Sequence, residues 1–383
     1  MRIHWLIGAI AAVACSNSDG PAASPQDSSP PADTAPVDTG SDTAVTYDFS
    51  ALETQLFGGA WKTDGVVVLH DGALVYEKYA NGYDATKRHI TYSASKTMGG
   101  ALIGLAIADG AMKREDSICK YITKPADADP TLCDTTIEHL LHMSSGLKWL
   151  EEYETSPTDS SVLQMLYGNE ADMGAYAARQ PRTSPAGTVW SYSSGDANML
   201  ALALRGALAG KDVRAWAKEK LFAPAGITSA IFETDRTGSL VFSSSCFLTP
   251  RDFARFGQLF LDDGKIDGKQ VLPPGWVAYS TTPAPPVEKP TPRVAGKAPG
   301  DSGGSYGALL WLNAASKDAT PDTWAFPQVP VDAFSAEGHW GQKLFIVPSR
   351  KLVIARVGND RDPVFDSGPM VQAAVAAIDA GGK

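Results

Sequence analysis

Strand-like runs lie at both ends of this chain, and helical patterns dominate the segment between them. Near the amino terminus, Val66–His70 and Leu74–Tyr79 flank an Asp71-Gly72 turn, which predicts a β-hairpin. Three later runs of this kind are Tyr306–Asn313, Lys343–Val347 and Leu352–Val357. If both groups pair in one antiparallel sheet, flanked by helices and with a mostly helical lobe inserted between them, the fold is α+β and a cleft separates sheet from helices.

Helix signals fill the middle and the end of the chain. Ala94–Asp109 is apolar on all sides, which predicts a largely buried helix that Gly110 ends. Thr249 and Pro250 form an N-cap and a first helical position, so another helix starts there. Further helices are expected at Thr135–His142, Asn198–Ala209 and Met370–Ala380. Residues 281–305 form a long Pro/Gly-rich loop, a kind of segment that is usually functional or disordered.

The first fifteen residues have the pattern of an export signal. Arg2 precedes the apolar run Ile3–Ala14, which is too short to span a bilayer. Small residues before Cys15 resemble a bacterial lipoprotein signal, in which that cysteine is lipidated, and Ser16 then favours the outer membrane. The alternative is an ordinary signal cleaved near Ala14. Both interpretations place the protein in the bacterial cell envelope, and the first makes Cys15 its only attachment to a membrane.

Residues 16–46 contain five Asp, five Pro and no Lys or Arg. Such a segment has too little apolar surface to offset its ordering entropy, so it is expected to be a disordered linker before a folded domain at residues 47–383. The net charge of the whole chain is −10. Because no basic stripe is present to neutralise phosphates, nucleic-acid binding is excluded.

Cysteine and histidine positions carry less information. An oxidising compartment permits a Cys119–Cys133 disulfide and leaves Cys246 unpaired and buried. His139 and His142 have ligand-like spacing, but they lie where an apolar helix runs into a turn. Core or surface histidines fit this context better than a metal site.

The first motif that carries chemistry is Ser93-Ala94-Ser95-Lys96, an S-x-x-K at the start of the buried helix. At this spacing the side chains of Ser93 and Lys96 lie on one helical face. A lysine whose pKa is lowered by burial can accept the serine proton, and the helix N-terminus offers N–H groups to an oxyanion. The alternative is a capping serine followed by a surface lysine.

Two further motifs follow. In Tyr192-Ser193-Ser194, a tyrosine beside an ammonium group can shuttle a proton. In His339-Trp340-Gly341-Gln342, glycine permits close backbone approach beside a strand, where an N–H can complete an oxyanion hole. The alternatives are a packing tyrosine in a serine-rich turn and an ordinary turn before a strand.

The order of the three motifs resembles that of the penicillin-recognising serine hydrolases. The chain is most similar to the class C β-lactamase-related group, which includes esterases, D-amino-acid peptidases and 6-aminohexanoate-dimer hydrolases. Supporting segments are IEHLLHMSSGLKW, TPRDFARFGQLFLDDGKIDGKQVLPPGW and GHWGQKLFIVPSRKLVIARVGN. The resemblance covers essentially residues 60–380 and implies a β-lactamase-like fold.

The resemblance also implies roles for individual residues. Ser93 would be the acylated nucleophile, Lys96 its proton-accepting neighbour and Tyr192 the general acid/base, while the order of proton transfer between the last two stays open. Backbone N–H groups of Ser93 and Gln342 would form the oxyanion hole. Substrate-binding positions would be Tyr153, Ser194, His339, Trp340 and Gly341. No metal or organic cofactor is required.

Departures from the family pattern narrow the range of expected substrates. Ser194 replaces a common asparagine, His339 replaces the lysine that helps hold a β-lactam carboxylate, and Trp340 adds bulk. They favour cleavage of a small ester or amide, with β-lactamase, D-Ala-D-Ala carboxypeptidase or D-aminopeptidase activity as alternatives. The remaining alternative is a non-catalytic binding protein of the cell envelope with the same fold. A Ser-His-Asp mechanism is disfavoured, since no G-x-S-x-G is present. The expected partner is a small-molecule ester or amide, and the oligomeric state stays open.

Overall fold

The computed structural model describes residues 46–153, 156, 158–168, 170–285, 305–315, 320–361 and 364–381. The chain divides into Met1–Ala44 and Val45–Lys383, and only the second unit is described below. The predicted export signal, Cys15, nearly all of the predicted linker and residues 286–304 of the Pro/Gly-rich loop lie outside the described residues.

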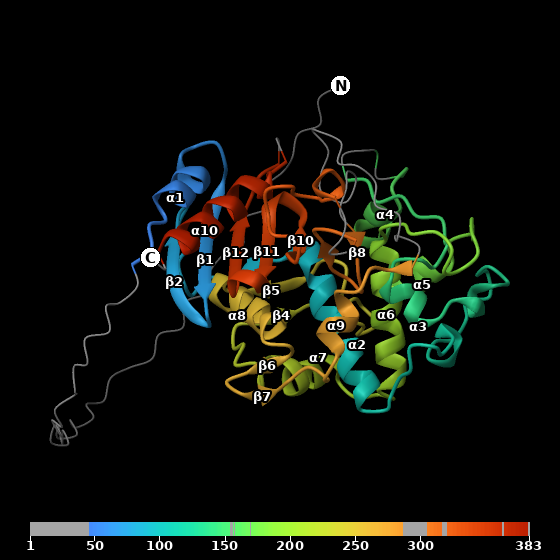
Figure 1. The fold of residues 1–383 in the computed structure, drawn as a ribbon. Helices are drawn as coiled ribbons and strands as arrows, with labels where there is room; N and C mark the ends of the chain where they lie inside the picture. Colours follow the sequence, from blue (N-terminus) through green and yellow to red (C-terminus); the bar gives the residue numbers. More distant parts are fainter. Residues whose placement is uncertain are drawn as a thin grey trace, which may run out of the picture. The chain divides into compact units, whose positions relative to one another are not determined.

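Strands from the two ends of this unit form one antiparallel sheet, as predicted. Its order is β2-β1-β12-β11-β10-β9-β8, so the N-terminal hairpin pairs with the C-terminal strands through β1 and β12 (Figure 1). The strand bounds are β1 Thr63–His70, β2 Ala73–Tyr79, β8 Ser305–Tyr306, β9 Trp311–Leu312, β10 Phe334–Gly338, β11 Gln342–Val347 and β12 Leu352–Gly358.

One strand prediction is wrong and one strand is not predicted. The run Tyr306–Asn313 is a tight hairpin of β8 and β9, because Leu309 adopts a left-handed conformation with φ of 60° and the chain reverses there. β10 ends in Glu337-Gly338, where Ser, Glu and Gly residues hide the β pattern. It is nevertheless almost wholly buried, because it pairs with β11 on one side and β9 on the other.

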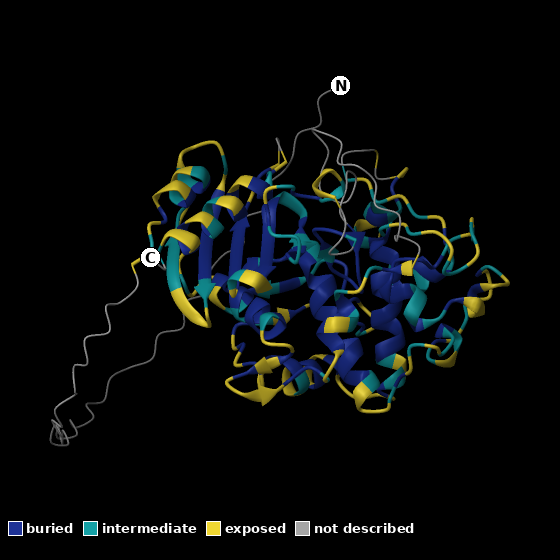
Figure 2. Cartoon of the chain, viewed as in Figure 1, coloured by how far each residue is buried: buried dark blue, intermediate teal, exposed yellow. Residues whose placement is uncertain are grey.

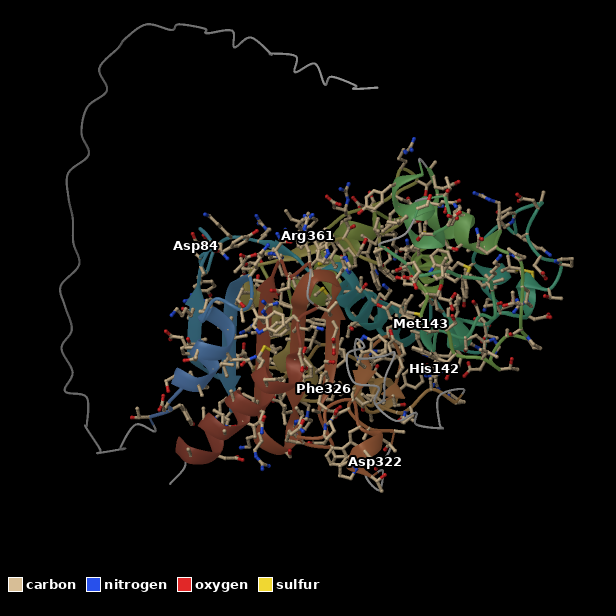
Figure 3. All side chains as sticks on the ribbon, turned by 90° about the horizontal axis from the view of Figure 1, so that it is seen from above. Asp84, His142, Met143, Asp322, Phe326 and Arg361 are labelled. Atoms are coloured by element: carbon tan, nitrogen blue, oxygen red, sulfur yellow. A yellow bond between two sulfur atoms is a disulfide. The ribbon has the colours of Figure 1, made fainter. Side chains whose placement is uncertain are left out.

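Alternate residues of the central strands enter two hydrophobic clusters, one on each face of the sheet. In β1, Val67 packs in the cluster that contains α2 and α8, whereas Val66 and Val68 pack in the cluster that contains α1 and α10. On the second face, Phe326, which is labelled in Figure 3, packs edge-on against Phe345, with 5.7 Å between the ring centres. The sheet is therefore covered on both faces, and its central strands are dark blue in Figure 2.

The helices of this unit have the following bounds: α1 Ser50–Phe57, α2 Ser95–Ala108, α3 Ile137–Leu141, α4 Ser161–Tyr167, α5 Met173–Ala178, α6 Ser194–Ala207, α7 Val213–Ala217, α8 Pro250–Leu261, α9 Trp276–Ser280 and α10 Ser367–Gly381. Small sheets join β3 His89–Ile90, β4 Ile231–Phe232 and β5 Cys246–Leu248, and also β6 Lys265–Ile266 with β7 Lys269–Gln270. Helices α2 and α6 are almost entirely buried (Figure 2).

Local capping explains where two of these helices start. Thr249 accepts a hydrogen bond from the backbone N–H of Asp252, which confirms the predicted N-cap of α8. Helix α6 begins at Ser194, four residues before the predicted start, because Ser193 caps it by accepting from the N–H of Asp196. Tyr192 therefore lies just ahead of a helix N-terminus.

Cys119 and Cys133 form a disulfide, and Cys246 is a buried free thiol. Burial raises the pKa of the Cys246 thiol. Within the described residues, no helix is long and apolar enough to cross a membrane.

Candidate active site

Ser93 lies in a short 3-10 turn, Tyr92–Ala94, that leads directly into α2. Tyr92, just before it, has a φ of 44°, so the chain bends sharply ahead of the serine. Lys96 follows in the first turn of α2 and is only 1% exposed. The S-x-x-K motif thus combines a pocket-lining serine with a fully buried lysine.

The amine of Lys96 has three hydrogen-bond neighbours. Its Nζ atom lies 3.1 Å from the Oγ of Ser93, 3.0 Å from the Oγ of Ser194 and 2.9 Å from the carbonyl oxygen of Ser243. Burial lowers the pKa of Lys96 to about 8, although the negative charge of Glu151 opposes this shift. A substantial fraction of this lysine is therefore neutral near pH 8.

The aromatic ring of Tyr192 covers the lysine amine. The Lys96 Nζ lies 4.8 Å from the ring centre, and the ring stacks on Trp311 at 5.3 Å. Burial raises the pKa of the Tyr192 phenol, although an interaction with the Ser93 side chain opposes this shift. The structure thus brings together all three residues to which the sequence assigns the chemistry.

Ser194 is buried beside Lys96. Its side chain is 1% exposed, accepts from Lys96 and donates to Glu151 Oε1 at 2.5 Å. It lines neither cavity beside Ser93. The structure therefore gives this hydroxyl two partners inside the protein, and its contact with substrate stays a prediction.

Glu151 is the residue that the sequence interpretation misses. Its carboxylate lines the larger cavity and accepts from Ser194, from the Tyr153 hydroxyl at 2.8 Å and from the Trp149 indole N–H. Its sequence signal is the segment Trp149-Leu150-Glu151-Glu152-Tyr153, which places this carboxylate two residues before the predicted substrate-binding residue Tyr153.

Two cavities meet at the nucleophile. The larger, of about 560 Å³, is lined by aromatic side chains and by carboxylates such as Glu151 and Glu337. The smaller, of about 440 Å³, is mainly apolar and includes Leu163, Leu166 and Met173. Residues common to both linings are Ser93, Tyr153, His339 and Trp340. A substrate carbonyl at Ser93 can therefore place one substituent on each side.

The predicted substrate-binding residues His339 and Trp340 form part of the wall between these cavities. His339 stacks on Tyr153 with ring centres 4.7 Å apart, and Trp340 faces the Arg361 guanidinium at 4.1 Å, where Arg361 is labelled in Figure 3. Gly341 has a φ of 90°, and a Cβ there would lie 2.1 Å from Nη1 of the buried Arg356. This turn requires glycine because the arginine supports it from behind.

The backbone N–H of Gln342 stays a predicted oxyanion-hole donor. This residue is fully buried, pairs with Gly338 in the β10–β11 ladder and lines neither cavity. The backbone that does line the larger cavity is Gly338–Gly341. A Cβ on Gly338 would lie 2.1 Å from the carbonyl oxygen of Thr91, so the end of β10 presses against the chain two residues before Ser93.

Among the described residues, no group of three or more His, Cys, Asp or Glu side chains is placed to hold a metal ion. His139 accepts from the backbone N–H of Thr136 in a capping box, and His142 lies 3.5 Å from Glu138. Both histidines therefore have local roles.

Comparison with known proteins agrees with this geometry. The family model described as Beta-lactamase matches residues 50–377. The chain belongs to the β-lactamase family. Its members are serine hydrolases, and the seven-stranded sheet with helices on both faces is the fold expected for this family.

Relatives of this β-lactamase-family chain include amide and ester hydrolases. It is 25% identical over 227 residues to a 6-aminohexanoate-dimer hydrolase of Paenarthrobacter ureafaciens, and the match covers 56% of each protein. The chain thus spans little more than half the length of that curated relative. A Bacillus anthracis structure provisionally assigned as a 6-aminohexanoate-dimer hydrolase is 26% identical, with a TM-score of 0.63 and coverage of 84% of this chain and 79% of the other.

A family VIII carboxylesterase structure has a TM-score of 0.64 at 15% identity, with coverage of 86% of this chain and 95% of the other. At that identity the likeness shows the fold alone.

Proposed function

We propose that this protein is an exported serine hydrolase that cleaves a small ester or amide through an acyl-enzyme on Ser93. The observation that carries the proposal is the buried Lys96 amine, whose Nζ lies 3.1 Å from the Ser93 hydroxyl. Burial lowers the lysine pKa to about 8, which suits a general base at near-neutral pH.

The proposed reaction has two halves. Lys96 takes the Ser93 proton while Oγ attacks the substrate carbonyl, and the oxyanion is held by the backbone N–H groups of Ser93 and Gln342. Tyr192 protonates the leaving alcohol or amine, which departs as the carbonyl re-forms. Water then attacks the acyl ester by the reverse proton path, releases a carboxylic acid and restores Ser93.

The walls of the two cavities support this substrate class. His339 and Trp340 occupy the edge beside Ser93, and the apolar side chains of the smaller cavity suit a short aliphatic or aromatic group. The amide hydrolase among the relatives supports this class. A dedicated β-lactamase is less well supported, because the lysine that helps hold a β-lactam carboxylate is replaced by His339.

Export to the cell envelope is part of the proposal. Its support is the signal pattern before Cys15 together with the Cys119–Cys133 disulfide, since disulfides persist in oxidising compartments. A reporter fusion that fractionates with membranes in the wild type, and with soluble protein after Cys15→Ala, would support lipidation.

Active-site labelling tests the proposed chemistry. A fluorescent fluorophosphonate should label the intact protein and should not label Ser93→Ala. Ser95→Ala is the matched control, because the Ser95 hydroxyl bonds to Thr91 and to the Cys246 N–H and lines neither cavity. It should keep its label. Absence of labelling in folded intact protein would favour a binding protein of the same fold.

Turnover then identifies the substrate. A panel of p-nitrophenyl esters, linear oligoamides, D-amino-acid amides and nitrocefin separates the candidate activities. Faster cleavage of nitrocefin than of any ester or oligoamide would overturn the assigned substrate class.

A further inference from the structure

The Ser194 hydroxyl lies between two groups that use its opposite sides. On one side its oxygen lies 3.0 Å from Lys96 Nζ, and on the other it lies 2.5 Å from Glu151 Oε1. A hydroxyl has one proton to donate, and a carboxylate can only accept. The proton therefore points to Glu151, and a lone pair of the oxygen faces Lys96.

The contacts around Glu151 fix it as an acceptor. Oε1 receives the hydroxyls of Ser194 and Tyr153, and Oε2 receives the Ser194 backbone N–H at 2.9 Å and the Trp149 indole N–H. The backbone and indole groups are donors that cannot turn around. A protonated carboxyl would leave one of these four donors without an acceptor, so the carboxylate form fits the site.

The hydrogen-bond donors and acceptors around Lys96 also determine the direction of its lone pair. A neutral amine has two N–H groups and one lone pair. One N–H points to the Ser194 oxygen and the other to the carbonyl of Ser243, which is 2.9 Å away and can only accept. The remaining neighbour of Nζ is the Ser93 hydroxyl at 3.1 Å. The lone pair is thus directed at the proton that must be removed.

We propose that Glu151 is a positioning residue that acts through the Ser194 hydroxyl to aim the lone pair of neutral Lys96 at Ser93. The inference rests on the proposed function, because it assigns Glu151 a part in the activation of that nucleophile. Residues 151 and 194 act as one unit, in which the carboxylate holds the hydroxyl as an acceptor toward the lysine.

The isosteric substitution Glu151→Gln reverses this arrangement. The amide oxygen of the new side chain has to face the Ser194 backbone N–H and the Trp149 indole, because both are fixed donors. Its NH₂ group then donates to the Ser194 oxygen. The Ser194 proton turns toward Lys96 and occupies the lone pair, so that Ser93 loses its base.

The test is a double-mutant cycle in the full chain, with a p-nitrophenyl ester as substrate. Glu151→Gln should lower kcat about 10- to 100-fold with little change in KM, the size expected for one misdirected polar contact. Ser194→Ala should lower kcat as well. In the Ser194→Ala background, Glu151→Gln should lower kcat by less than about a further threefold, because the hydroxyl that connects residue 151 to Lys96 is absent. Full additivity would overturn the inference.

The pH profile gives a second readout. The Glu151 charge opposes the burial effect on Lys96, so Glu151→Gln should move the acidic limb of kcat/KM to lower pH while the plateau falls. Other titratable groups that face this centre are Tyr153 in the loop, Tyr192 just before α6, Asp196 in the first turn of α6, Tyr306 in β8 and Glu337 in β10. These groups are unchanged in the variant, so an unmoved limb contradicts the assignment.

Controls separate this inference from the proposed function. Glu115→Gln changes an exposed carboxylate that lines neither cavity and lies outside these hydrogen bonds, and it should keep wild-type kcat. Wild-type activity that survives Ser93→Ala overturns both proposals, whereas full kcat in Glu151→Gln overturns only this one. If Glu151→Gln does not fold, Ser194→Ala alone decides: wild-type kcat without that hydroxyl contradicts the inference.

Discussion

The amine of Lys96 faces the ring of Tyr192 and not its hydroxyl, with Nζ 4.8 Å from the ring centre. A cation in this position interacts with the π-face and gives little direct stabilisation to a phenolate oxygen. Burial at the same time raises the phenol pKa. Within the proposed function, Lys96 is therefore the first proton acceptor, and neutral Tyr192 is the proton donor to the leaving group. The sequence left this order open.

Tyr192→Phe should discriminate between leaving groups. An amine must be protonated in order to depart, whereas p-nitrophenolate departs without a proton. We expect kcat/KM to fall at least about tenfold more for an anilide than for the p-nitrophenyl ester of the same acid. Equal losses on both substrates would mean that Tyr192 serves mainly to cover Lys96, and a matched pair of substrates measured on one protein preparation gives the answer.

The activity should depend on pH through Lys96. Because the neutral amine is the base, kcat/KM for an uncharged ester should rise with pH through about 8. The folded-state pKa of Lys96 lies below its ordinary value, so the unfolded chain binds that proton more tightly. The free energy of unfolding should thus rise with pH from about 8 toward the ordinary lysine range. A pH profile that is flat across this interval would contradict the assignment of Lys96.

Asp196 provides a stability test that does not involve the chemistry. It accepts from the N–H and the hydroxyl of Ser145, and burial raises its pKa to about 7. The folded chain therefore retains this proton between the ordinary aspartate pKa and about 7, and the free energy of unfolding falls as pH rises through this window. Asp196→Asn removes the effect. The Tm of the variant minus the Tm of the wild type should increase as pH rises from about 4 to about 8. A difference in Tm that stays constant over this range would show that the pKa of Asp196 is not raised.

The Cys119–Cys133 disulfide closes a short loop, with a sequence separation of 14. Loss of such a cross-link costs about 3 kcal/mol in the chain-entropy model. Denaturant unfolding should show this decrease for Cys119→Ser/Cys133→Ser. Reductant should destabilise the wild type by a similar amount and leave the double variant unchanged. Equal stability of oxidised and reduced wild type would mean that the cross-link contributes nothing.

Local sequence determined much of the fold and part of the site. The Asp71-Gly72 turn between β-branched runs fixed the β1–β2 hairpin, and Thr249-Pro250 fixed the start of α8. The i, i+3 spacing of Ser93 and Lys96 placed the nucleophile and its base on one helical face. These features depend on residues within a few positions of one another, so the sequence displays them directly.

Only the tertiary structure decided what surrounds those residues. Ser194 is 98 positions from Lys96 and 43 from Glu151. Ser243, whose carbonyl accepts a hydrogen bond from the Lys96 amine, is 147 positions from that lysine. No local pattern encodes such approaches, because they arise when α2, α6 and the segment before β5 pack around one buried amine. The same packing places Gln342 in the β10–β11 ladder and buries the Ser194 side chain. At both positions the surrounding structure, and not the local motif, determines which groups a side chain can reach.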